Sequence, residues 1–192
     1  MFELLTGLGL AMPAGLNAYI PLLAVALADR YTGLVQLAAP YDVVSSPLAI
    51  VIIAILLVIE LLADKIPIVD HVNDLIQSGI RPSAGAVLLM ASTDTVESIN
   101  PIVAMILGLL VAGGIHTAKT SFRPIVTATT AGIGNPIVSA VEDGIAIVVT
   151  VIALIAPIII ALILLMVTSM LIVMLRRRRA HRSAEPAQVR RT

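Results

Sequence analysis

Cysteine is absent from this chain of 192 residues, and charged side chains are scarce. Without cysteine the chain has no disulfide, no thiolate zinc site and no cysteine nucleophile. Charged residues make up 12% of the chain, well below their share in soluble domains, whereas 59% is hydrophobic and the mean hydropathy is +1.06. So few polar side chains could not cover a water-soluble fold. We therefore predict an all-α integral membrane protein with the lipid bilayer as its solvent.

An excess of charge of one sign is also lacking, because 12 basic residues balance 12 acidic ones. A neutral chain has no overall basic field, so no nucleic-acid partner is expected. The start Met-Phe-Glu-Leu-Leu has no basic n-region, so we expect the first apolar run to be retained as a span. We interpret the tail 176–192 as disordered and its arginines as a cytoplasmic lipid-headgroup anchor. These arginines are Arg176, Arg177, Arg178, Arg179, Arg182, Arg190 and Arg191.

Six apolar runs predict about six transmembrane helices within a membrane domain of residues 1–175: 4–28, 47–63, 82–98, 100–117, 124–141 and 144–175. With both termini in the cytoplasm, Lys65 and Arg81 fall in one cytoplasmic loop, and Lys119 and Arg123 fall in the other. This distribution follows the positive-inside rule, and a re-entrant fifth run would break it by moving Lys119 and Arg123 outside. The outer side then holds Arg30 with Asp29, Asp42, Asp94, Glu97, Glu142 and Asp143.

A weak internal similarity links the first and fourth runs. Gly9-Leu10 followed by Gly15-Leu16-Asn17 aligns, at a constant offset, with Gly108-Leu109 followed by Gly114-Ile115-His116. In the six-span topology these runs point in opposite directions, as an inverted 3+3 repeat requires. Because glycine and leucine are abundant in any membrane helix, a chance match stays open as the alternative.

Glycine and proline predict interruptions in the first and fifth helices. The first run contains three glycines and two prolines close to Asn17, and the fifth contains Gly132-Ile133-Gly134-Asn135-Pro136. Unwound backbone at membrane depth needs protein or a water cavity around it, so we expect a solute or ion site between these helices. Its predicted contacts are Asn17, Thr127, Thr130 and Asn135. The alternative is close packing of small residues with interhelical hydrogen bonds. The last run exceeds the bilayer core, so it should tilt, bend at Pro157 or begin in the interface.

The densest polar cluster follows the second run. A short amphipathic helix is expected near residues 68–76, and His116, Lys119 and Arg123 reach the same side of the membrane. We predict a gate or proton relay here, because juxtamembrane ionisable groups are costly and histidine titrates near neutrality. A network of mutually neutralised pairs is the alternative. The predicted residues are Glu60, Asp64, Lys65, Asp70, His71, Asp74, Arg81, His116 and Arg123.

The sequence lacks the common motifs of enzymes and of metal-binding or cofactor-binding sites. The chain has no His-Glu-x-x-His, no Gly-x-Ser-x-Gly and no phosphate-binding glycine loop. The group Asp70, His71 and Asp74 lacks a second close histidine, so it is a weak candidate for a zinc site. We predict no enzyme, with an intramembrane hydrolase as a minor alternative, and neither a metal nor a cofactor.

Four segments resemble a bacterial membrane family called domain of unknown function 4126. These segments are Gly15-Leu-Asn17-Ala-Tyr-Ile-Pro21, Ala63-Asp64-Lys65-Ile-Pro67-Ile-Val-Asp70-His71-Val-Asn73-Asp74, Arg81-Pro82 and Thr127-Ala-Thr-Thr130-Ala-Gly-Ile-Gly134-Asn135-Pro136. The resemblance covers residues 3–175 and implies a bacterial inner-membrane protein, without implying an activity.

Two functions are compatible with these features. The first is a small transporter or channel-like permease for a small solute or ion, with proton coupling through the polar cluster. The second is a non-catalytic scaffold or lipid-organising module that binds a partner through loop 64–82. Six short helices around little interior volume also favour a homodimer in the bilayer.

Overall fold

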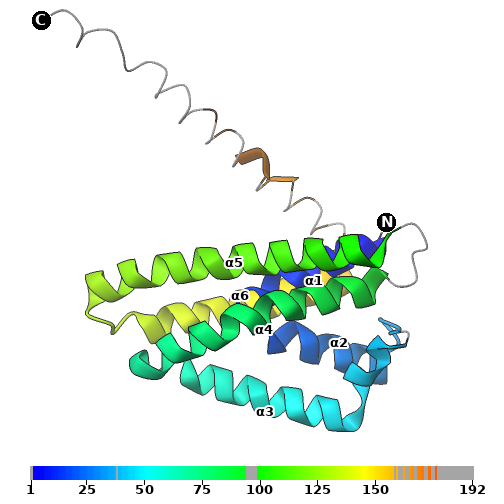
Figure 1. Cartoon of the computed structure of the whole chain (residues 1–192), viewed down its shortest axis with the longest axis horizontal. Helices are drawn as coiled ribbons and strands as arrows, with labels where there is room; N and C mark the ends of the chain where they lie inside the picture. Colours follow the sequence, from blue (N-terminus) through cyan, green and yellow to red (C-terminus); the bar gives the residue numbers. More distant parts are fainter. Residues whose placement is uncertain are drawn as a thin grey trace, which may run out of the picture.

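The computed structural model describes residues 2–37, 39–93 and 99–157, together with scattered positions between 159 and 176. The regular structure of the described residues is entirely helical, and the helices lie side by side in one bundle (Figure 1). They are α1 (Phe2–Ala14), α2 (Tyr19–Tyr31), the short 3-10 helix η1 (Tyr41–Ser45), α3 (Pro47–Ala63), α4 (Pro67–Thr93), α5 (Pro101–Thr130) and α6 (Asn135–Ile155).

The first apolar run forms a helical hairpin. Glu3 in α1 and Val35 after α2 line one surface pocket, so the two helices run antiparallel and the chain turns back at residues 15–18 (Figure 1). The predicted interruption is therefore present, but the prediction that residues 4–28 cross in one direction is wrong. The tip sits directly on α5, since a Cβ at Gly15 would lie 2.4 Å from the Ala112 carbonyl oxygen.

Helices α4 and α5 continue through residues expected in loops. The predicted amphipathic helix near 68–76 and the run 82–98 share the 27-residue helix α4, which has Pro82 inside it. Likewise α5 is a single 30-residue helix across Lys119, Arg123 and Pro124, which joins the run 100–117 to the start of 124–141. Helix α5 continues because its buried face continues. Lys119 and Arg123 follow His116 at helical spacing and are buried with it.

The fifth run is interrupted as predicted, but at a turn between two helices. Ala131 adopts the left-handed conformation (φ 52°) after α5 ends, and α6 begins at Asn135. Helix α6 ends at Ile155, and Ala156 leaves the helical conformation directly before Pro157, as the residue before a proline tends to do. The bend predicted at Pro157 is thus a helix end. Asp94, Glu97 and the tail 177–192 lie outside the described residues.

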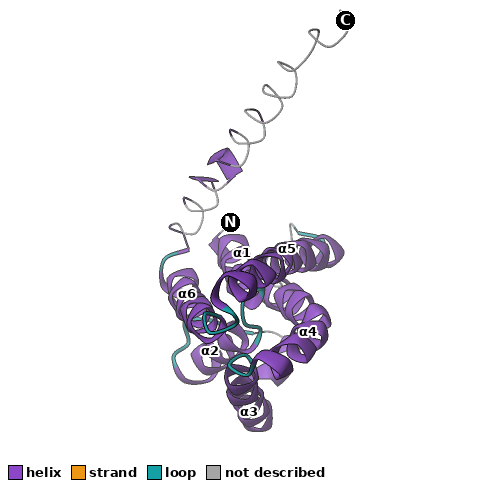
Figure 2. Cartoon of the chain, turned by 90° about the vertical axis from the view of Figure 1, so that its left-hand side faces the viewer, coloured by secondary structure: helices purple, strands orange, loops and turns teal. Residues whose placement is uncertain are grey.

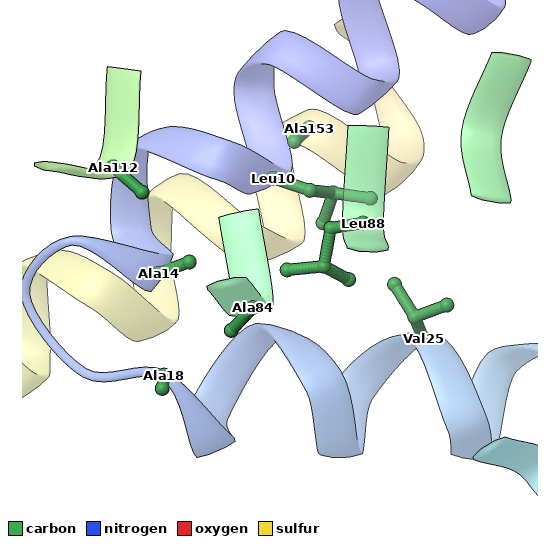
Figure 3. Close-up of a cluster of buried hydrophobic side chains, with 8 residues drawn as sticks. All are labelled: Leu10, Ala14, Ala18, Val25, Ala84, Leu88, Ala112 and Ala153. Carbon is green, nitrogen blue, oxygen red and sulfur yellow. The ribbon is translucent and has the colours of Figure 1, made fainter. Parts of the chain in front are cut away.

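Small residues allow α4 and α5 to pack closely. A Cβ added to Gly108 would lie 2.4 Å from the Gly85 carbonyl oxygen and 2.6 Å from the Ala86 Cα. The apolar core beside this contact joins α1, α2, α4, α5 and α6, and Leu10, Val25 and Leu88 are its largest buried side chains (Figure 3). Seen along the bundle, α3 lies at the edge, packed mainly on α2 (Figure 2).

The two ends of the bundle are distinct. Gly7 in α1 lies against Ser92 at the end of α4, whereas Lys65 precedes the start of α4, so the N-terminus and Lys65 occupy opposite ends (Figure 1). Placing both on one side of a membrane was therefore wrong. Helices α1 and α5 run in the same direction (Figure 1), with Gly15 and Leu16 beside Ala112 and Lys119. The opposite orientation that an inverted repeat requires of these segments is not found.

Apolar side chains cover much of the outer surface. Helices α5 and α6 are long and apolar enough to cross a membrane, and α3 is a shorter apolar helix of 17 residues. Large hydrophobic residues are exposed along all three, including Leu48 (70%), Leu110 (66%) and Ile155 (69%).

Candidate functional site

Buried polar side chains form stripes on α5 and α6. His116, Lys119 and Arg123 follow one another at spacings of three and four on α5 and are buried. On α6, Asn135, Ser139 and Asp143 are spaced four residues apart, Thr150 follows seven residues later, and all four are buried. Because residues three or four apart share a helix face, each stripe points into the bundle.

Asp64 is the centre of the buried charged cluster. It caps the end of α3, and its side chain is 2% exposed. Its Oδ2 lies 3.4 Å from both Lys119 Nζ and Arg123 Nη2 and accepts a hydrogen bond from Ser139 Oγ (3.2 Å), while Oδ1 accepts from Asn73 (2.7 Å). Burial alone would raise the pKa of Asp64, but Lys119, Arg123 and Arg81 outweigh burial and hold this pKa below its usual value.

Arg81 connects three helices within the cluster. Its guanidinium, fully buried on α4, donates to Glu60 Oε1 on α3 (2.8 Å) and lies 3.5 Å from Asp74 Oδ1. The nitrogen that faces Asp74, Nη1, is also 3.0 Å from His116 Nδ1 on α5. A guanidinium can only donate, so Nδ1 of His116 is the acceptor and the imidazole is neutral in this arrangement.

Glu142 and Asp143 belong to this cluster as well. Glu142 Oε2 lies 3.1 Å from Lys119 Nζ and 3.4 Å from Arg123 Nη2. Asp143 Oδ1 accepts a hydrogen bond from Asn17 Nδ2 (3.0 Å). Their predicted place on the outer side, apart from Lys119 and Arg123, is wrong. Hydropathy treats charges at 119–123 and 142–143 as loop ends. Here Glu142 pairs with Lys119 and Arg123, and Asp143 bonds Asn17 inside the bundle.

Polar side chains satisfy the broken backbone at the hairpin tip. Asn17 Oδ1 accepts from the Tyr19 and Ile20 amides and so caps α2. Lys119 Nζ donates to the carbonyl of Leu16 (3.0 Å). The tip is thereby tied to α5 through Lys119 and to α6 through the Asn17–Asp143 bond.

The other predicted solute contacts lie at the α5–α6 turn. The side-chain Nδ2 of Asn135 donates to Thr127 Oγ1 (3.0 Å). The backbone N–H of Gly134 donates to Thr130 Oγ1 (3.0 Å). Asn135 and Asp143, the partner of Asn17, are eight residues apart on α6, which is about 12 Å of helix. Asn17 and Asn135 thus bond different partners, and a solute site that includes both stays a prediction.

The predicted gate residues divide into two groups. Glu60, Asp64, Asp74, Arg81, His116 and Arg123 come together as expected. Lys65 is exposed and donates to the Leu61 carbonyl, away from the cluster. The side chains of Asp70 and His71 lie outside the described residues.

Negative charge exceeds positive charge in the described part of the cluster. Five carboxylates, which are Glu60, Asp64, Asp74, Glu142 and Asp143, lie with three basic side chains, which are Arg81, Lys119 and Arg123. Glu60 Oε2 and Gln77 Oε1 are buried without a hydrogen-bond partner among the described residues. Within that part of the chain, no three acidic or histidine side chains are placed to hold a metal ion.

Several members of the site were not predicted from the sequence. They are Asn73, Ser139, Glu142 and Asp143. The available signal was spacing: Asn135, Ser139 and Asp143 repeat every four residues, as the buried face of a helix does.

A family profile matches almost the entire chain. The profile, described as Domain of unknown function (DUF4126), covers residues 4–177. The chain belongs to the DUF4126 family. This match confirms the resemblance seen in Asp64-Lys65-Ile-Pro67 and Gly134-Asn135-Pro136. No curated protein and no solved structure matches the chain.

Proposed function

We propose that this member of the DUF4126 family is a small proton-coupled permease of the bacterial inner membrane. Exposed apolar side chains along α3, α5 and α6 support the membrane location, because soluble monomers rarely expose large contiguous apolar surfaces. Helices α3 to α6 cross the bilayer in this proposal, and the α1–α2 hairpin enters it and returns. The end with Lys65, Lys119 and Arg123 faces the cytoplasm in this proposal, because among α1 to α6 and their connections the opposite end carries one base, Arg30, and the positive-inside rule places the excess of bases in the cytoplasm. The N-terminus then lies on the opposite side.

The charge imbalance of the buried cluster carries the proposal. Five carboxylates with three bases leave negative charge that is expensive to bury, at several kcal/mol per unpaired ion. A proton or a cation entering the cluster relieves this cost, and its departure restores the cost. Such a group, placed at the broken tip of a re-entrant hairpin, resembles the ion sites of secondary transporters.

Proton movement between the carboxylates follows from their shared partners. Arg81 contacts Glu60 and Asp74, and Arg123 contacts Asp74, Asp64 and Glu142. When one carboxylate takes a proton, its base is released toward a neighbouring carboxylate. The two basic side chains therefore couple the protonation of one carboxylate to that of the next.

The scaffold alternative is less compatible with the side-chain positions. It requires the charges of residues 64–82 to face a partner. Asp64 and Arg81 are buried in the bundle, and Asp74 is paired with Arg81 and Arg123. Buried charges therefore fit a transport role better than a docking surface.

A pH jump on a solid-supported membrane tests the proposal without a known solute. Liposomes with the full-length protein should give a transient current that protein-free liposomes lack. Asp64→Asn should reduce this current at least about tenfold, because the carboxylate that holds Arg81, Lys119 and Arg123 among the other carboxylates is gone. Asp42→Asn, an exposed change outside the cluster, should leave it unchanged.

Glu142→Gln provides a second variant if Asp64→Asn fails to fold, as judged by size-exclusion chromatography. It should reduce the current while leaving Asp64 with its three bases. A wild-type current equal to that of protein-free liposomes would overturn the proposal. So would full currents from both cluster variants.

A further inference from the structure

A groove between α2, α3 and α6 reaches the edge of the charged cluster. Its volume is about 260 Å³, and its lining is almost wholly apolar. Helix α2 packs against both α3 and α6 and forms the floor. Two polar side chains, Asp143 and Thr150, line the groove among apolar side chains that include Leu23, Leu27, Ile147 and Val151.

Asp143 is the carboxylate of the cluster without a basic partner. Its side chain is 8% exposed and accepts a hydrogen bond from the neutral amide of Asn17. No lysine or arginine of the described residues lies within 4.0 Å of its carboxylate. A buried carboxylate in this position favours a positively charged group brought from outside.

Thr150 is a second, independent polar feature of the groove. Its residue is 1% exposed, and its hydroxyl has no hydrogen-bond partner among the described residues. A buried hydroxyl without a partner is destabilising, and a hydrogen bond from a ligand offsets this cost. Thr150 lies seven residues after Asp143 on α6, so about 10 Å of helix separates them.

We propose that this groove binds a small primary alkylammonium ion, with its nitrogen on Asp143 and its chain along α6 toward Thr150. The ammonium supplies the positive charge and N–H donors that the carboxylate lacks, and the alkyl chain covers Leu23, Leu27 and Val151. A hydroxyl at the far end of the chain reaches Thr150. Ile147 and Val151 are about half exposed at the rim, so the ligand enters from the apolar surroundings. This inference rests on the proposed function, because it names the solute class of the same cluster.

Binding of hexylammonium and 6-aminohexanol to the full chain in lipid nanodiscs tests the groove, with empty nanodiscs subtracted. Wild type should bind both ligands, and 6-aminohexanol should bind more tightly. Asp143→Asn should weaken both at least about tenfold, while its amide oxygen keeps the hydrogen bond from Asn17. Thr150→Val, which preserves shape, should weaken 6-aminohexanol about threefold to tenfold and leave hexylammonium within about twofold. Hexanol, which lacks the charge, should not compete.

Three outcomes would overturn the inference. They are no saturable amine binding by wild type, equal binding by Asp143→Asn, and full competition by hexanol. Loss of amine binding with intact pH-jump currents would reject the groove and leave the transport proposal standing. Amine binding without pH-jump currents would reject the transport proposal and leave the groove as a binding site.

Discussion

At the scale of single residues, Asp64 matters most because three bases depend on it. Lys119, Arg123 and Arg81 all lie within 4.0 Å of one of its oxygens, and the site is nearly closed to solvent. Breaking a buried ion pair by removing one partner is costly, because the remaining charges stay buried without compensation. Exposed charges close by in the sequence carry no such cost.

Replacing Asp64 by alanine should therefore lower the free energy of unfolding by about 3–5 kcal/mol. Lys65→Ala is the matched control, since the Lys65 ammonium is exposed and donates to the Leu61 carbonyl, and it should change stability by less than about 1 kcal/mol. Reversible unfolding of the purified protein in mixed micelles measures both. Equal losses for the two variants would contradict the central position of Asp64.

The lowered pKa of Asp64 also predicts a pH dependence. A carboxylate with a lower pKa in the folded state stabilises the protein above its unfolded-state pKa, about 3.9, and this contribution fades as pH falls through the folded-state value. The difference in melting temperature between wild type and Asp64→Asn should stay constant from about pH 8 to pH 5. It should narrow only below about pH 4. A difference that disappears near neutral pH would contradict this assignment.

At the scale of helices, the position of a glycine decides whether it contributes to helix packing. Gly108 and Gly114 both lie in α5, but Gly108 faces the backbone of α4 and Gly114 faces open space. The six-residue offset turns them to different sides of the helix. Only the first can control how closely α4 and α5 approach.

Gly108→Ala should destabilise the protein by about 1–3 kcal/mol, because the new methyl group would force the backbones of α4 and α5 apart. Gly114→Ala should be neutral or should stabilise by up to about 1 kcal/mol, since alanine favours the helix and meets nothing. Thermal unfolding of both variants in one detergent gives the comparison. A loss for Gly114→Ala as large as that for Gly108→Ala would contradict the packing described.

Helix content and the two interruptions could be predicted from sequence, whereas helix connections could not. The glycines and prolines around Asn17 and Asn135 mark real breaks, because they lower the cost of leaving a helix. Whether a break reverses the chain depends on contacts with distant residues, such as Lys119 on the Leu16 carbonyl. Hydropathy also scores Lys119 and Glu142 as solvated, because it ignores the partners that neutralise them.

At the scale of the whole molecule, the opposite ends of the bundle predict a distinctive accessibility pattern. The natural chain has no cysteine, so single cysteines can be labelled without background. Glu3→Cys and Leu34→Cys should react with a membrane-impermeant maleimide from one side, because these residues line one pocket at the same end. Lys65→Cys should react only from the other side.

Labelling of intact cells and of inside-out vesicles makes this measurement. Reaction of position 3 from the same side as position 65 would mean that residues 2–31 cross the membrane once, against the hairpin. Reaction of positions 3 and 34 from different sides would have the same meaning.

The long sequence separations at the hairpin tip also bear on synthesis. Asn17 and its partner Asp143 are 126 residues apart, and Leu16 and Lys119 are 103 apart. The ribosome therefore releases the hairpin long before the helices that satisfy its tip exist. Until α6 emerges, the tip remains a polar loop without its final contacts, so a nascent chain truncated before Asp143 should be a preferred target of the membrane's quality-control proteases.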